Sequence, residues 1–188
     1  MPGATVCAMG NTIVVPGLGG SGHDHWQSHW LRDLPGAVRV EQREWDQPDR
    51  GEWVAELHAT IQRATGPVVL IAHSLGCHTV AHWAQDHEAD IRAALLVAPP
   101  DIDHSVSQGA PIAGFGPPAA NPLPFPAVLA AGTTDRWAQL DQSRGLADRW
   151  GARFVDLGDV GHVNPDAGFG PWPEGEKLLR DLLNDTAG

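Results

Sequence analysis

Ser74, Asp135 and His162 are the residues whose types and order in this chain could perform nucleophilic catalysis. A serine hydroxyl is a poor nucleophile, so a histidine must take its proton as the oxygen attacks a carbonyl carbon. The histidine in turn needs a carboxylate that fixes its tautomer and stabilises its cationic form. If the fold brings these three side chains together, they form a centre for acyl transfer to serine.

The segment 68–78, Val-Val-Leu-Ile-Ala-His-Ser-Leu-Gly-Cys-His, indicates that Ser74 is the nucleophile. An apolar, β-branched run ends in a turn of the form small-x-Ser-x-Gly and continues with helical periodicity. Such a turn exposes the serine, and Ala72 and Gly76 are small where strand and helix crowd together. The backbone N–H of Leu75, at the start of the helix, is predicted to stabilise an oxyanion. The pattern alone also fits a plain strand-to-helix turn.

Asp135 and His162 each follow a predicted strand further along the chain. Serine, aspartate and histidine in this order, beyond the C-terminal ends of parallel strands, form the arrangement of α/β-hydrolases. Asp135 could instead be only a turn residue or a helix N-cap. Asp101 and Asp103, after the preceding strand, are rival candidates for the acid.

A glycine-rich loop follows the first predicted strand in residues 14–22, Val-Val-Pro-Gly-Leu-Gly-Gly-Ser-Gly. It lacks the Gly-Lys-Ser/Thr of a phosphate-binding loop and the glycine spacing of a dinucleotide fingerprint. In a hydrolase such a loop passes close to the nucleophile and supplies the second oxyanion donor. The backbone N–H of Leu18 is the candidate.

The elements that must position these residues alternate between short apolar runs and longer segments of helical periodicity. This alternation predicts βαβ units and a sheet of about six mostly parallel strands, covered by helices on both faces in three layers. The expected strands are 12–16, 37–41, 67–72, 93–98, 127–132 and 153–156. The expected helices are 24–34, 51–64, 75–87, 139–150 and 173–185.

Residues 99–126 break this rhythm, because they hold eight of the 16 prolines and no sustained periodicity. The segment leaves the C-terminal end of one strand and returns before the next. It is therefore expected to be a loop over the edge of the sheet where ligands bind, or else a tolerated surface insertion.

Length and charge limit the classes of partner. A chain of 188 residues is expected to form one domain over 1–188, with residues 1–10 frayed. A net charge of -11 argues against nucleic acid or an anionic membrane as a partner. We find no signal peptide or membrane-spanning run, so a cytoplasmic location is expected. Cys7 and Cys77 are predicted to be free thiols.

Ten histidines invite a metal-site interpretation, especially the pairs His25 and His29 and His78 and His82, each four residues apart. A zinc site needs further ligands, and no His-Glu-x-x-His motif occurs. The sequence therefore favours no metal. Beside the nucleophile and the candidate acid, His73 and Trp137 are predicted to line a substrate pocket.

Several motifs together resemble one family. They are Pro-Gly-Leu-Gly-Gly-Ser-Gly-His-Asp-His-Trp-Gln-Ser-His-Trp, Val-Glu-Gln-Arg-Glu-Trp, Ala-His-Ser-Leu-Gly-Cys, Leu-Val-Ala-Pro-Pro-Asp, Pro-Leu-Pro-Phe-Pro and Gly-His-Val-Asn. Along nearly the whole chain they look like the small bacterial serine hydrolases grouped with YdeN and retinoblastoma-binding protein nine. The resemblance implies a minimal α/β-hydrolase without a cap domain, a Ser74–Asp135–His162 triad, and no metal or organic cofactor.

The first hypothesis for function is therefore a serine hydrolase that acts on small-molecule esters or amides. A non-catalytic binding protein on the same scaffold is the rival from another class, since a fold does not dictate a function. Acyl transfer or another chemistry at the same triad is a third possibility. The substrate and the oligomeric state are not encoded in any motif.

Overall fold

The computed structural model describes residues 11–186. The predicted frayed segment 1–10, with Cys7, lies outside the described residues, so these two expectations stay predictions. The extent of one domain over 1–188 also stays a prediction. No helix of the described part is both long and apolar enough to cross a membrane.

Within residues 11–186, six parallel strands form one sheet in the order β2-β1-β3-β4-β5-β6. The central strand β3 is buried along its whole length, which explains its unbroken apolar sequence. The predicted parallel architecture is confirmed. The strands are β1 (Asn11–Val15), β2 (Val38–Arg39), β3 (Val68–His73), β4 (Ile91–Val97), β5 (Ala127–Ala131) and β6 (Arg153–Asp156).

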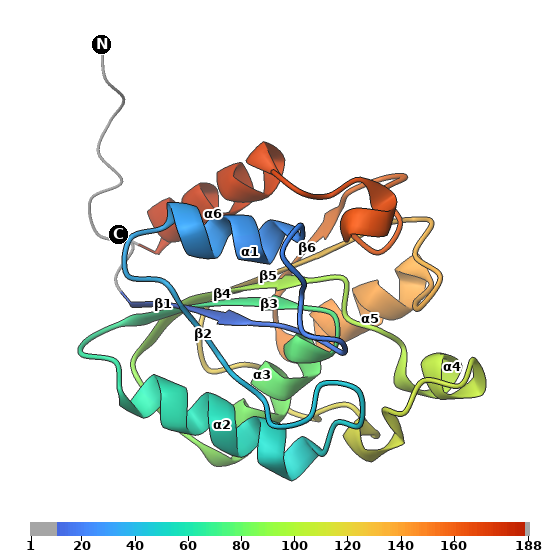
Figure 1. The fold of residues 1–188 in the computed structure, drawn as a ribbon, viewed down its shortest axis with the longest axis horizontal. Coiled ribbons are helices and arrows are strands. Elements are labelled where there is room, and N and C mark those ends of the chain that lie inside the picture. Colours follow the sequence, from blue (N-terminus) through green and yellow to red (C-terminus); the bar gives the residue numbers. More distant parts are fainter. Residues whose placement is uncertain (1–10, 187–188) are drawn as a thin grey trace.

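Helices cover both faces of the sheet (Figure 1). On one face α1 and α6 pack through Trp26, Trp30 and Leu179. On the other face α2, α3 and α5 pack through Leu57, Val80 and a large set of aliphatic strand residues. The helices are α1 (Trp26–Asp33), α2 (Arg50–Gln62), α3 (Leu75–Asp86), α4 (Ile102–Ser107), α5 (Leu140–Trp150) and α6 (Pro173–Asp185).

Local sequence signals explain where several helices begin and end. The Asp49 carboxylate accepts a hydrogen bond from the backbone N–H of Glu52 and so caps α2. Gly151 ends α5 in the left-handed conformation that glycine adopts without steric cost. Pro173 is the first residue of α6, where its missing N–H is not needed.

The segment 99–126 is more ordered than its composition predicts. It contains α4 and a 3-10 turn, Ala113–Phe115, and both are anchored in a small apolar cluster through Ile102 and Phe115. Asp101 caps α4 by accepting from the backbone N–H of His104. A helix of six residues is too short to produce a periodic pattern, which is why the sequence did not reveal it. No separate cap domain occurs within residues 11–186.

Candidate active site

Ser74 lies in a strained turn between β3 and α3. Its backbone dihedrals are φ 54° and ψ −126°, a conformation that L-residues avoid. The neighbouring backbone leaves no room for larger residues: a Cβ on Gly76 would overlap the carbonyl oxygen of Val15, and one on Gly17 would lie 2.8 Å from Ser74 Cβ. The end of β1 therefore comes so close that position 76, two residues after Ser74, must be glycine.

His162 and Asp135 meet Ser74 at the C-terminal edge of the sheet. His162 Nε2 lies 2.9 Å from Ser74 Oγ, and His162 Nδ1 lies 2.7 Å from Asp135 Oδ2. The Asp135 side chain is only 2% exposed and that of His162 11%. The buried carboxylate makes Nδ1 the protonated nitrogen of His162, so the unprotonated Nε2 faces the serine hydroxyl.

The structure brings Asp135, and neither rival aspartate, to this histidine. The other oxygen of Asp135, Oδ1, accepts the backbone N–H of Trp137 at 2.9 Å, which fixes the carboxylate. Asp101 instead caps α4, and Asp103 is exposed on that helix. Asp101 is therefore used as a helix cap, and Asp103 faces solvent, so neither pairs with His162.

Two backbone N–H groups next to Ser74 are without an acceptor among the described residues. They belong to Leu18, in the loop after β1, and Leu75, the first residue of α3. The N–H of Gly19 is used, because it donates to the carbonyl of Trp45. Leu18 and Leu75 are the two residues that the sequence predicts as oxyanion donors, and both line the cavity at Ser74.

Two further histidines lie beside His162. His73 Nε2 donates to the backbone carbonyl of His162 at 2.8 Å, so His73 holds the histidine loop as well as lining the cavity. The ring of His25 lies 4.6 Å from that of His73, and its Nδ1 accepts the backbone N–H of Gln27 as the cap of α1. Sequence reasoning missed this role of His25, because its ring partner is 48 positions away along the chain.

Burial keeps both of these imidazoles neutral. It lowers the pKa of His25 to about 4, with a smaller contribution from repulsion by His162. Burial, again with repulsion by His162, holds the pKa of His73 well below its usual 6.5. Neither ring therefore adds a positive charge beside His162 near neutral pH.

A cavity of about 360 Å³ opens at Ser74. This volume suits a small organic molecule. Trp137, predicted as a pocket wall, lines it, and so do residues of the segment 99–126. Its apolar lining residues include Leu18, Leu75, Pro100, Ala110, Ile112 and Trp137, and its polar groups include those of Ser21, His25, Asn164 and Asp166.

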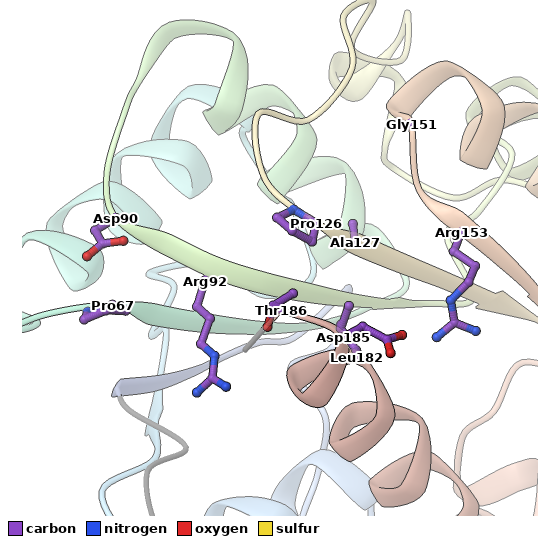
Figure 2. Close-up of a pocket in the computed structure, with 10 residues that line it drawn as sticks. All are labelled: Pro67, Asp90, Arg92, Pro126, Ala127, Gly151, Arg153, Leu182, Asp185 and Thr186. Atoms are coloured by element: carbon purple, nitrogen blue, oxygen red, sulfur yellow. The ribbon is translucent and has the colours of Figure 1, made fainter. Parts of the chain in front are cut away.

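A larger cavity of about 750 Å³ lies at the opposite edge of the sheet, where the strands begin (Figure 2). Its described lining contains no serine, cysteine or histidine. Arg92 and Arg153 extend toward the side of α6, and Arg92 Nη2 donates to the carbonyl of Leu183 at the end of that helix. Arg92 thus caps a helix here, and the smaller cavity is the candidate active site.

The second histidine pair considered for a metal site, His78 and His82, makes hydrogen bonds to the backbone. His78 Nε2 donates to the carbonyl of Pro100, and His82 Nε2 to that of Phe115. Among the described residues, no group of three or more His, Cys, Asp or Glu side chains has a metal-binding arrangement. Cys77 is a buried free thiol, and burial raises its pKa.

The parallel sheet, its two helical layers and the serine turn after the central strand together define an α/β-hydrolase. The chain belongs to the serine hydrolase family, whose model matches residues 12–181. No curated protein sequence matches it significantly.

Solved structures of YdeN-like hydrolases resemble this chain along most of its length. A candidate YdeN-like hydrolase from Pectobacterium atrosepticum is 34% identical, with a TM-score of 0.83, and the match covers 94% of this chain and 91% of that one. The ydeN gene product of B. subtilis is 18% identical, with a TM-score of 0.77, and the match covers 94% and 100%. A thermophilic esterase from Thermogutta terrifontis shares the fold at 16% identity, with a TM-score of 0.63 and coverage of 94% and 90%. The predicted YdeN-like resemblance and fold class are confirmed.

Proposed function

We propose that this chain is a carboxylesterase-like serine hydrolase that cleaves small esters or amides through an acyl-enzyme. The observation that carries the proposal is the continuous row of hydrogen-bonded groups from Ser74 Oγ through the His162 ring to Asp135. This row ends at a cavity of small-molecule size. Membership of the serine hydrolase family supports the same chemistry.

In the first half-reaction Ser74 Oγ forms a bond to the carbonyl carbon of the substrate while His162 Nε2 takes the hydroxyl proton. Asp135 stabilises the imidazolium that results, through the hydrogen bond to Nδ1. As the tetrahedral intermediate collapses, His162 gives this proton to the leaving alcohol or amine. The acyl group stays on Ser74.

The negative charge of the intermediate develops on the former carbonyl oxygen. The backbone N–H groups of Leu18 and Leu75 are its proposed donors. Backbone donors of this kind are held in place before the reaction starts, and losing one costs about 10²-fold to 10³-fold in kcat. In the second half-reaction a water molecule, deprotonated by His162, attacks the acyl carbon and releases the acid.

The test of the proposal is covalent labelling by a fluorophosphonate probe. The wild type should gain one probe adduct, and peptide mass spectrometry should place it on Ser74, because only an activated serine displaces the fluoride rapidly. The Ser74→Ala variant should stay unlabelled. An unlabelled wild type, or equal labelling of the variant, would overturn the proposal and favour a non-catalytic protein.

A labelled wild type can still be an acyltransferase, so the products must also be identified. With p-nitrophenyl butyrate in water, a hydrolase releases butyric acid and nitrophenol in equal amounts. Addition of ethanol, glycerol or an amine should divert little of the acyl group. A product mixture dominated by the acceptor's ester or amide would contradict hydrolysis as the main reaction.

The acid of the triad can be assigned by two matched substitutions. Asp135→Asn is expected to lower kcat about 10⁴-fold, because the amide no longer holds His162 in the tautomer that faces Ser74. Asp101→Asn should leave kcat unchanged, since asparagine caps a helix as well as aspartate does. Steady-state hydrolysis of p-nitrophenyl butyrate measures both. A larger loss in the Asp101 variant would reverse the assignment.

A further inference from the structure

The loop that carries Leu18 is attached to the body of the protein on two sides. On the side of β2, Arg39 Nη2 donates to the carbonyl of Gly20, and the N–H of Gly19 donates to the carbonyl of Trp45 at 3.1 Å. The Arg39 guanidinium also lies over the Trp45 ring, 4.8 Å from its centroid. Two consecutive residues of the loop are therefore bound to one arginine–tryptophan pair.

Steric contact reinforces this attachment. Gly20 has a φ of 79°, and a Cβ at this position would lie 2.8 Å from Trp45 Cδ2 and 2.9 Å from Arg39 Nη2. The loop backbone thus rests directly on the two side chains. Glu41 Oε1 lies 3.6 Å from Arg39 Nε, which is an ion pair but not a hydrogen bond. The Arg39 side chain is only 28% exposed, so its position is largely fixed by packing.

The second attachment comes from α1. The buried amide of Gln27 donates to the carbonyls of Val15, the last residue of β1, and Ile71, within the neighbouring strand β3. Its Oε1 accepts the hydroxyl of Ser21 at 2.6 Å, and the Ser28 hydroxyl donates to the carbonyl of Ser21 at 2.9 Å. Ser21 has a φ of 47°, so these bonds hold it in a conformation that it would otherwise avoid.

These contacts use the N–H of Gly19, the carbonyls of Gly20 and Ser21 and the Ser21 hydroxyl, whereas the N–H of Leu18 has no protein acceptor among the described residues. We propose that Arg39 is a positioning residue, which sets the orientation of the Leu18 N–H toward the oxyanion through the carbonyl of Gly20 and the ring of Trp45. This inference rests on the proposed function, because it gives Arg39 its role through the oxyanion donor.

The loop needs such an attachment because a backbone donor stabilises a transition state only when its direction is fixed beforehand. Glycines 17, 19, 20 and 22 make this loop intrinsically mobile, so side chains outside the loop must supply the rigidity. Arginine suits the task because its planar group can stack on an indole and donate hydrogen bonds at its edge at the same time.

The test compares the Arg39→Met and Arg39→Lys variants with the wild type and with the matched control Arg43→Met. Arg43 lies four residues further on, in the connection from β2 to α2, and its side chain is 77% exposed with an ion pair to Glu56 at 3.9 Å. With p-nitrophenyl butyrate, Arg39→Met should lower kcat about 10-fold to 100-fold and change KM less than about twofold, as expected for a misdirected oxyanion donor. Arg39→Lys should give a smaller loss, and the control none.

A second measurement separates positioning from a merely structural role. Trifluoromethyl propyl ketone adds to the serine and forms an oxyanion like that of the reaction. Its inhibition constant should rise by the same factor as kcat/KM falls, because both depend on the same donors. Fluorophosphonate titration corrects every rate for the fraction of active protein, so partial unfolding does not mimic the effect.

Each outcome has a distinct meaning. If folded Arg39→Met retains kcat within about twofold of the wild type, or loses kcat without weaker ketone binding, the positioning role is wrong. If Arg39→Met does not fold, the same two measurements on Arg39→Lys and on Ser21→Ala decide, because each weakens one attachment. A wild type that is neither labelled nor active would instead refute the proposed function itself.

Discussion

Replacing Ser74 with alanine is expected to lower kcat about 10⁶-fold, to the level set by the remaining oxyanion donors and by substrate binding. Alanine removes the only atom of residue 74 that can form the acyl-enzyme. It should also leave the strained turn in place, because His162 is the only hydrogen-bond partner of the lost oxygen among the described residues. The affinity of the site for the acid product, butyrate, should change little.

The His162→Ala variant tests whether Ser74 and His162 act as one catalytic unit. Without the base the serine hydroxyl is not activated, so the single variant should be as inactive as Ser74→Ala. The double variant should then be no worse than either single one, because the two residues act as one unit. Kinetics on p-nitrophenyl butyrate, with enzyme purified away from host esterases, measure all three. Additive losses, or a Ser74→Ala variant within about tenfold of the wild type, would contradict a serine nucleophile.

The strands and the three candidate catalytic residues could be predicted from the sequence for physical reasons. A parallel sheet buried on both faces needs unbroken apolar strands, and residues 68–72 supply one. The turn at Ser74 needs small neighbours, which the sequence shows directly at Gly76. Asp135 and His162 follow strands, and the ends of parallel strands gather at one edge of the sheet.

The contacts that hold the loops around the candidate site could not be predicted. They join residues far apart in the chain, and no local sequence pattern marks them. His73 holds the carbonyl of His162, 89 positions away. Arg39 and Gly20 are 19 positions apart, and no spacing rule predicts a side chain that binds a loop carbonyl. The two-residue strand β2 was predicted longer, since its apolar neighbours resemble a strand although only Val38 and Arg39 pair with β1.

Acidification from pH 6.5 to pH 4 is expected to destabilise the fold strongly, because three buried histidines resist protonation. His25, His73 and His78 are each 5% exposed or less. Burial, the largest cause in each case, lowers the pKa of His25 and of His78 to about 4 and that of His73 well below 6.5. An unfolded chain has no such burial, so its imidazoles titrate near 6.5.

Proton uptake sets the direction in which the free energy of unfolding changes with pH. Between pH 6.5 and pH 4 the unfolded chain binds protons that the folded chain excludes, so the free energy of unfolding rises with pH and falls on acidification. Well above pH 6.5 both states are neutral at these positions and the dependence disappears. Each pKa lowered from 6.5 to about 4 corresponds to about 3 kcal/mol, so His25 and His78 alone remove a large part of a typical domain's stability.

Urea unfolding followed by tryptophan fluorescence, at several values between pH 7.5 and pH 4.5, measures this dependence. The His78→Gln variant should show a slope that is shallower by about 1.4 kcal/mol per pH unit, because one buried imidazole is gone and the glutamine amide can still donate to the carbonyl of Pro100. The control His23→Gln replaces a histidine whose side chain is 83% exposed, so its slope shows what loss of an imidazole outside the core contributes. Asp24 and Asp181 do not interfere, because their exposed carboxyls have pKa values lowered from 3.8 and titrate below this window. A free energy of unfolding that stays flat from pH 6.5 to pH 4.5 would show that these imidazoles become protonated within the fold.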